Sequence, residues 1–198
     1  MENLLLEKGR ALVLVAHPDD ETIWMGGTIL NNPHIEWTIF GLCRGDDSDR
    51  APKFRHVLEF LGARGSISDL EDEDVLNIRE SVPEIKRRIN RELKQKDFTF
   101  IFTHAYNGEY GHPRHKGVHR ALRELVDNRQ LITNNLLYFA YKLDEAKRIA
   151  VPDKSATFIS RLPRQILEKK KKIIYELYGF SKKSFEFKSC SGIETFNP

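Results

Sequence analysis

The chain alternates between short apolar runs and longer polar segments, and each apolar run predicts a buried strand. The runs cover Ala11–Ala16, Ile35–Leu42 and Phe98–Thr103, and a further strand-like segment spans Asn135–Tyr141. Continuous apolar runs of roughly four to eight residues that end at turn signals are typical of strands buried on both faces of a parallel sheet. The pattern therefore predicts a largely buried sheet.

Amphipathic segments between these runs predict helices. Gly26–Gly27 would let the first helix pack closely, Pro52 suits the first turn of the second, and Gly62 ends it. The predicted helices are Thr22–Leu30, Pro52–Leu61, Glu84–Lys94 with Pro83 near its start, Val118–Val126 and the amphipathic Ile166–Leu177. We expect loops at Arg44–Arg50 and over the acidic stretch Ser66–Asn77. This alternation indicates an α/β fold, with a Rossmann-like, mostly parallel sheet and helices on both faces.

Composition places the chain among ordinary globular proteins. Its 198 residues are 40% hydrophobic and 31% charged, and no repeat or linker divides them, so residues 1–198 are expected to form one domain. The longest apolar run, Ala11–Ala16, is far shorter than the roughly 20 residues of a membrane span. Met1–Arg10 lacks the apolar stretch of a secretory signal, and Cys43 and Cys190 are too few for a disulfide framework. We therefore expect a cytoplasmic protein with reduced thiols.

Positive charge is concentrated near the C-terminus. The formal net charge is +3, and the basic excess lies mostly in Lys169–Lys172 and Lys182–Lys183. Such a cluster is either a solvated helix face or a contact for phosphate or an anionic surface. No signature of an RNA- or DNA-binding protein accompanies it, so nucleic acid is not expected as a partner.

A histidine and three carboxylates follow the first predicted strand, in the segment Ala16–Glu21 (AHPDDE). Carboxylates this close repel one another unless a cation joins them. Pro18 bends the chain between His17 and Asp20, which lets an imidazole nitrogen and a carboxylate oxygen converge as metal ligands. Spacing alone leaves a second interpretation open, in which Asp19 or Asp20 caps the following helix and accepts its backbone N–H groups.

A second polar cluster follows the strand that ends at Thr103. Four of the seven histidines lie within sixteen residues, at His104, His112, His115 and His119. Because the carboxyl ends of parallel strands meet at one edge of a sheet, this cluster should lie near the first one. Three protein ligands with one open position are typical of catalytic zinc, and a histidine here would be the third. The pattern leaves His104 and His119 without a firm role.

These two motifs together resemble the PIG-L/LmbE-like zinc-dependent N-acetylglucosaminyl de-N-acetylases. The resemblance rests on AHPDDE after the first strand and on Tyr-Gly-His-Pro-x-His far downstream, and it extends over about residues 10–180. The family includes enzymes that deacetylate N-acetylglucosamine in glycolipid, thiol-cofactor and polysaccharide pathways. Membership would imply the LmbE-like fold and amide hydrolysis at one zinc ion per chain, although sites of this kind also accept other divalent metals.

The resemblance also implies roles for individual residues. The positions that match the family's metal ligands are His17, Asp20 and His115. Asp19 matches the general base, and His112 matches the histidine that stabilises the oxyanion or protonates the leaving amine. Tyr110 matches a mobile tyrosine that helps to polarise the carbonyl group.

Substrate contacts are less strongly encoded. Arg50 stands where the family often has a substrate-contacting arginine, and Arg44 and Asn107 lie on loops at the same end of the sheet. The chain departs from the family pattern at two positions, with Lys53 in place of the usual Glu and Arg114 in place of the usual Asp. If that Asp orients a metal ligand, Arg114 cannot do so, although it could face an anionic group of the substrate.

On this basis we expect the substrate to be an N-acetylated amino sugar or a sugar conjugate, bound as a small molecule. Trp24 either lines the pocket or packs in the core. Two other functions remain open: a metal-dependent phosphoesterase, which would need a second metal ion, and a degenerate metal-binding or interaction protein. A homo-oligomer is compatible with the sequence.

Overall fold

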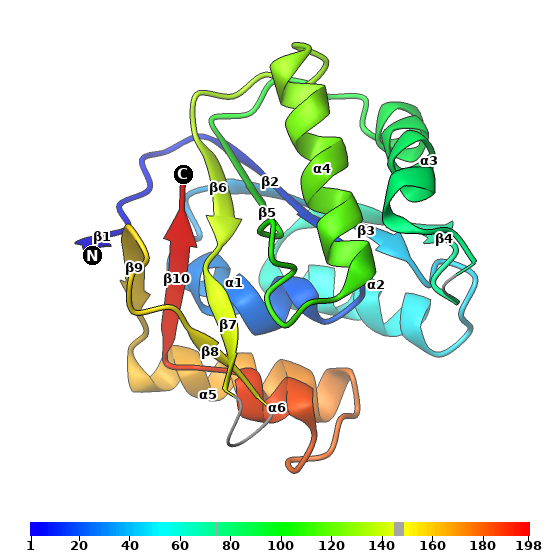
Figure 1. The fold of residues 1–198 in the computed structure, drawn as a ribbon. Coiled ribbons are helices and arrows are strands. Elements are labelled where there is room, and N and C mark those ends of the chain that lie inside the picture. Colours follow the sequence, from blue (N-terminus) through cyan, green and yellow to red (C-terminus); the bar gives the residue numbers. More distant parts are fainter. Residues whose placement is uncertain (74, 145–148) are drawn as a thin grey trace.

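The computed structural model describes residues 1–73, 75–144 and 149–198. Among them, eight strands form one sheet in the order β1-β9-β10-β6-β5-β2-β3-β4, and β7 pairs with β8 in a separate ribbon (Figure 1). The strands of the large sheet are β1 (Glu2–Asn3), β2 (Arg10–Val15), β3 (Glu36–Cys43), β4 (Arg64–Leu70), β5 (Phe100–Thr103), β6 (Leu136–Phe139), β9 (Phe158–Arg161) and β10 (Ile193–Asn197). Strands β2 to β6 are parallel, whereas β10 runs antiparallel to both of its neighbours.

Helices cover both faces of this sheet, as the alternating pattern predicts. On one face lie α3 (Ile78–Glu92) and α4 (Pro113–Asp127); on the other lie α1 (Asp20–Asn31) and α2 (Arg50–Leu61) (Figure 1). Leu12 and Leu14 of β2 pack in the α3–α4 core, and Val13 and Val15 pack in the α1–α2 core. Since successive side chains of a strand point to opposite faces, an unbroken apolar run is what this position demands. The fold class is confirmed.

The first half of the acidic stretch Ser66–Asn77 was wrongly expected as a loop. Arg64–Leu70 is strand β4, an edge strand paired in parallel with β3. Most residues of β4 are polar or glycine, and the strand is paired on one side only, so hydrophobicity gives little signal. Gly65 permits the pairing, because a Cβ there would lie 2.0 Å from the carbonyl oxygen of Ile39. Asp74 lies outside the described residues.

Two predicted helices begin more than one helical turn earlier than expected. Helix α3 starts at Ile78, because Asn77 and Glu80 form a capping box, and Pro83 therefore lies inside the helix rather than at its start. Helix α4 starts at Pro113 rather than Val118, and the side chain of His112 caps it. In both cases the polar first turn hides the helix from a search for apolar periodicity.

The C-terminal third is more elaborate than its sequence indicates. The predicted strand Asn135–Tyr141 divides at Ala140 into β6 and β7 (Tyr141–Asp144), and β7 pairs with β8 (Ile149–Pro152). Sequence analysis missed β1, β8, β9 and β10 and the short helix α6 (Phe185–Ser189). These elements are two to five residues long, so they carry no periodic pattern.

The predicted helix Ile166–Leu177 is α5 (Arg164–Lys172) followed by the π-helical turn η1 (Ile173–Leu177). Lys169 and Lys172 are exposed and Lys171 is half-buried, but Lys170 is fully buried and donates to Glu194 at 2.7 Å. That carboxylate also accepts the backbone N–H groups of Gly27 and Thr28, at 2.8 and 2.6 Å. The ion pair thus joins α5, α1 and β10.

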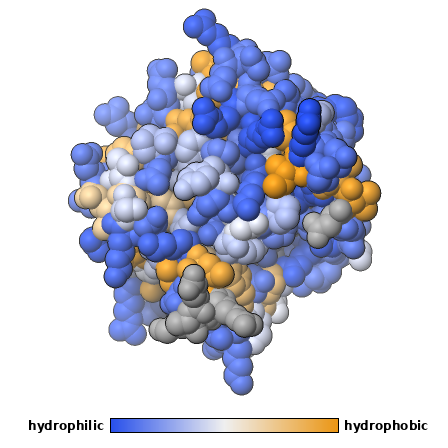
Figure 2. All heavy atoms as spheres, viewed as in Figure 1, coloured by the Kyte–Doolittle hydropathy of each residue, from blue (hydrophilic) through white to orange (hydrophobic). Residues whose placement is uncertain are grey.

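Hydrophilic residues cover most of the face seen in Figure 2, and the apolar residues on it form small separate patches. No helix in the described part of the chain is both long and apolar enough to cross a membrane. Cys43 and Cys190 are both buried as free thiols.

Candidate metal centre and active site

The two polar motifs meet at the carboxyl ends of β2 and β5, which are neighbours in the sheet. A cavity of about 380 Å³ opens there. Seven of the nine predicted site residues line it: His17, Asp19, Asp20, Arg44, Arg50, Tyr110 and His112. His115 is fully buried behind them, and Asn107 does not line the cavity.

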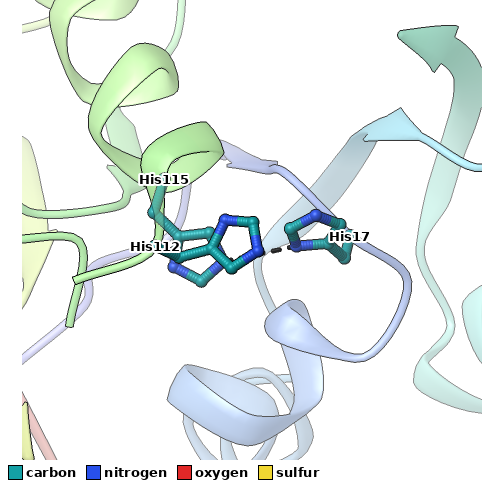
Figure 3. A group of neighbouring side chains, drawn as sticks. All are labelled: His17, His112 and His115. Atoms are coloured by element: carbon teal, nitrogen blue, oxygen red, sulfur yellow. Dashed lines mark hydrogen bonds between the residues drawn. The ribbon is translucent and has the colours of Figure 1, made fainter. Parts of the chain in front are cut away.

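Three donor atoms from the predicted metal ligands converge on one point. His17 Nδ1 and Asp20 Oδ2 are 3.3 Å apart, and His115 Nε2 lies 3.3 Å from each of them. Figure 3 shows that His115, at the start of α4, faces His17, which lies on the loop after β2. Tetrahedral zinc, with bonds of about 2.0–2.1 Å to nitrogen and oxygen, needs donors about 3.3–3.4 Å apart. The triangle therefore has the dimensions of three zinc ligands.

Each of these three side chains is held from behind by a partner that the sequence analysis did not assign. Asp72 Oδ1 lies 3.0 Å from His17 Nε2, Glu109 Oε2 lies 2.5 Å from His115 Nδ1, and Trp24 Nε1 donates to Asp20 Oδ1 at 2.8 Å. A carboxylate that accepts a hydrogen bond from the N–H of one imidazole nitrogen leaves the lone pair of the other nitrogen free for a metal. The partners fix both histidines in the tautomer that a metal site requires.

Glu109 is the centre of a wider buried network. Its carboxylate accepts from His104 Nδ1 at 2.8 Å and from the backbone N–H of Ala105 at 2.8 Å, as well as from His115. Burial opposes its ionisation, but His104 and His115 together outweigh that effect and lower the pKa of Glu109 to about 2. His104 Nε2 in turn accepts the backbone N–H of Ala16 at 2.9 Å, and the ring stacks on His115. His104 therefore ties the end of β2 to the second motif.

His119, the other histidine without an assigned role, lies 3.0 Å through Nδ1 from the carbonyl oxygen of His104. It supports the same network from the next turn of α4. The adjacency of Glu109 and Trp24 to the motifs is the only signal that could have found these partners, and Asp72 has no such signal.

Electrostatics at the centre favour a bound cation. Burial opposes the charge on Asp20, but His115 and His104 lower the pKa of Asp20 well below its usual value. Burial also disfavours a charged His17, yet its hydrogen bonds to Asp20 and Asp72 raise the pKa of that histidine well above normal. The buried carboxylates thus draw positive charge into the site, and a divalent cation supplies it without protonating a ligand.

Asp19 lies beside the triangle with a backbone φ of 115°, a conformation that residues other than glycine rarely adopt. Glu21 Oε2 accepts the N–H of Asp19 at 3.0 Å, and Tyr178 donates to Glu21 Oε1 at 2.8 Å. This strained turn directs the Asp19 carboxylate into the cavity rather than onto the helix end. Burial, together with the charge of Asp20, raises the pKa of Asp19 well above its usual value, which suits a proton acceptor.

His112 and Tyr110 present hydrogen-bond donors to the same cavity. The backbone N–H of Arg114 donates to His112 Nδ1 at 3.2 Å, so the proton of the neutral ring is on Nε2. Burial and the neighbouring His115 lower the pKa of His112 to about 4. A donor nitrogen of His112 lies within 4.8 Å of those of His17 and His115 (Figure 3). Burial raises the pKa of Tyr110, so its hydroxyl stays protonated.

The three predicted substrate contacts differ in their placement. Arg50 lines the cavity, with its guanidinium 4.3 Å from the Phe180 ring and 3.8 Å from Asp19 Oδ2. Arg44 also lines it and pairs with Asp72 at 3.1 Å. Asn107 instead donates to the carbonyl oxygen of Tyr141 at 2.9 Å, which braces the loop after β5.

Arg114 and Trp24 are also placed by the structure. Arg114 is buried and binds the Glu71 carboxylate at 2.6 Å rather than lining the cavity. Trp24 is fully buried but still forms part of the cavity wall, so both interpretations of this residue hold.

Comparison with solved structures places this fold among several enzymes. The A40926 pseudoaglycone deacetylase Dbv21 is 18% identical, with a TM-score of 0.65 over 87% of this chain and 82% of that one. The N,N'-diacetylchitobiose deacetylase of Pyrococcus horikoshii is also 18% identical, with a TM-score of 0.60 over 87% and 71%. The 4-carboxy-2-hydroxymuconate hydratase GalB of Pseudomonas putida is 14% identical, with a TM-score of 0.61 over 91% and 82%. At these identities the likeness establishes the fold.

Sequence comparison establishes the family. An uncharacterised protein of Acanthamoeba polyphaga mimivirus is 24% identical over 183 residues, which cover 84% of this chain and 77% of that protein. The sequence profile of the PIG-L family, described as GlcNAc-PI de-N-acetylase, matches residues 12–126. This match covers more than half of the chain and includes both motifs that form the centre. The chain therefore belongs to the PIG-L family.

Proposed function

We propose that this protein is a zinc-dependent hydrolase that removes the acetyl group from an N-acetylated amino sugar, such as an N-acetylglucosamine conjugate. The observation that carries the proposal is the 3.3 Å triangle of His17, Asp20 and His115 donors, with Asp19 beside it in the same cavity. Family membership and the fold shared with two deacetylases support the same reaction. The buried free thiols are compatible with a cytoplasmic location, and we propose one domain over residues 1–198.

Zinc held by the three ligands would polarise the amide carbonyl group and lower the pKa of a bound water to about 7. Asp19 accepts a proton from the attacking water, whose oxygen forms the new bond to the carbonyl carbon. Neutral His112 donates a hydrogen bond from its Nε2–H group to the oxyanion that develops, and the Tyr110 hydroxyl donates a second hydrogen bond. Asp19 then returns its proton to the leaving nitrogen as the C–N bond breaks, which yields acetate and a free amine.

His112 fits the role of a hydrogen-bond donor better than that of a general acid. Its pKa of about 4 means that the ring carries no spare proton near neutral pH. The backbone N–H of Arg114 also occupies Nδ1, which leaves Nε2–H as the one donor that the ring offers. Of the two roles that the family resemblance allows, we therefore propose oxyanion stabilisation.

The cavity is compatible with a single sugar ring. Its volume of about 380 Å³ lies near the lower end of the roughly 300–1,000 Å³ typical of small-molecule sites. Trp24, Tyr110 and Phe185 contribute apolar wall, and Arg50 and Asp47 contribute polar groups. Sugars need this combination of an apolar surface and hydrogen-bonding groups.

The proposal is tested by metal content and by acetate release from N-acetylglucosamine and N,N'-diacetylchitobiose. We expect about one zinc ion per chain, lost in His115→Ala, and acetate release that falls at least a hundredfold in Asp19→Asn without loss of zinc. Two metal ions per chain with activity on phosphate esters would favour a phosphoesterase. Acetate release that is equal in Asp19→Asn and the parent would rule out Asp19 as the base.

A further inference from the structure

Arg114 is almost completely buried, with only 1% of its side chain exposed, yet it does not line the cavity. It points instead to the segment that follows β4, which is described at residues 71–73 and 75–76. Its Nε donates to the carbonyl oxygen of Glu71 at 2.8 Å, and its Nη2 donates to the Glu71 carboxylate at 2.6 Å. Two parallel contacts from a planar guanidinium fix both the distance and the angle between the start of α4 and this segment.

Glu71 organises the segment that Arg114 holds. Its carboxylate accepts the backbone N–H groups of Val75 and Leu76, both at 3.0 Å, and also that of Glu73. One carboxylate thus gathers several backbone donors, and Arg114 compensates its charge. The segment has little apolar material of its own to hold it in place, because most of its residues are acidic.

The residue next to Glu71 belongs to the metal centre. Asp72 Oδ1 lies 3.0 Å from His17 Nε2, and its second oxygen accepts from Arg44 at 3.1 Å. With the proton of His17 held on Nε2 by Asp72, the Nδ1 lone pair faces the donors of Asp20 and His115. The placement of Glu71 therefore decides whether Asp72 can orient a metal ligand.

We infer that Arg114 is a positioning residue for the metal centre, acting through Glu71 and Asp72 on His17. Its neighbour His115 is itself a ligand, so the first turn of α4 places one ligand directly and supports another through the segment after β4. Glu109 orients His115, a task that Arg114 could not perform as a cation. This inference rests on the metal centre proposed above.

The test compares zinc dissociation constants, measured by competition with a chromophoric chelator, in the parent, Arg114→Met and Asp72→Asn. Arg88→Met is the matched control, because Arg88 is also largely buried and joins α3 to β4 through an ion pair with Asp69, away from the metal ligands. Absorption spectra of the cobalt-substituted proteins report the geometry at the metal, and melting temperatures of the metal-free proteins report stability separately.

We expect Arg114→Met to raise the zinc dissociation constant at least tenfold and to alter the cobalt spectrum. Arg88→Met should change the constant less than twofold, even where its melting temperature falls as much. The double variant with Asp72→Asn should bind zinc no more weakly than Asp72→Asn alone, because both changes break the same chain of contacts. If Arg114→Met does not fold, Arg114→Lys, which keeps the charge but loses the paired donors, gives the same comparison.

Three results would overturn the inference. A zinc affinity that is unchanged in the Arg114 variant, or effects of Arg114 and Asp72 that multiply in the double variant, would show that Arg114 does not act through Asp72. A parent protein that binds no zinc would overturn the proposed metal centre and, with it, this inference.

Discussion

Substitution of Glu109 by glutamine should weaken metal binding without removing a metal ligand. In the native protein, Glu109 Oε2 accepts from both His115 and His104, and Oε1 accepts the N–H of Ala105. A glutamine has one accepting oxygen and one donating nitrogen at these two positions. Either orientation of the amide leaves at least one buried N–H group facing another donor.

The magnitude follows from these contacts. A buried donor without an acceptor costs about 1–3 kcal/mol, and this is the expected loss in the free energy of unfolding of the metal-free protein. Where the amide nitrogen faces His115, the imidazole escapes the conflict by moving its proton to Nε2, which removes the lone pair that a metal needs. Loss of such an orienting partner typically weakens metal binding 10- to 100-fold, or by about 1.4–2.8 kcal/mol.

Zinc dissociation constants from chelator competition, together with urea unfolding of the metal-free proteins, would test this reasoning. Glu124→Gln is the control, because it makes the same change in net charge. Glu124 is a partly exposed carboxylate on α4 that pairs with Lys86. We expect zinc affinity within about twofold of the parent in the control. An equal zinc affinity in Glu109→Gln and the parent would refute the role assigned to Glu109.

Three further predictions concern stability and the turn that carries the base. Glu194→Gln should lower the free energy of unfolding by about 3–5 kcal/mol in urea melts, because it leaves the charge of Lys170 buried without an opposite charge; a loss below about 1 kcal/mol would contradict this. Asn77→Ala should cost about 0.5–2 kcal/mol through loss of the α3 cap, with activity unchanged at saturating substrate. Tyr178→Phe removes the hydroxyl that donates to Glu21, so kcat should fall about fivefold, the equivalent of one hydrogen bond of about 1 kcal/mol, at unchanged zinc affinity; an unaltered kcat would exclude this support.

Local sequence was sufficient for the central strands, and it marked the two motifs as candidate sites without settling their chemistry. A strand buried on both faces must be apolar throughout, so Ala11–Ala16 predicted β2 to within one residue. The strand order of a parallel sheet then brings the ends of β2 and β5 together, and with them His17 and His115. Elements without a pattern of their own, such as β4 and β10, were missed because pairing rather than composition holds them in place.

The sequence by itself determined the fold class, because strand periodicity is a local property, and its two motifs pointed through resemblance to the family and to the three residues that we propose as metal ligands. Only the tertiary structure decided which groups orient those ligands. Asp72 lies 55 residues from His17 in the chain, and Arg114 reaches Glu71 across 43 residues. Contacts of this kind depend on where β4 and α4 pack in three dimensions, so the role that we infer for an arginine outside the family motif can be recognised only in the folded protein.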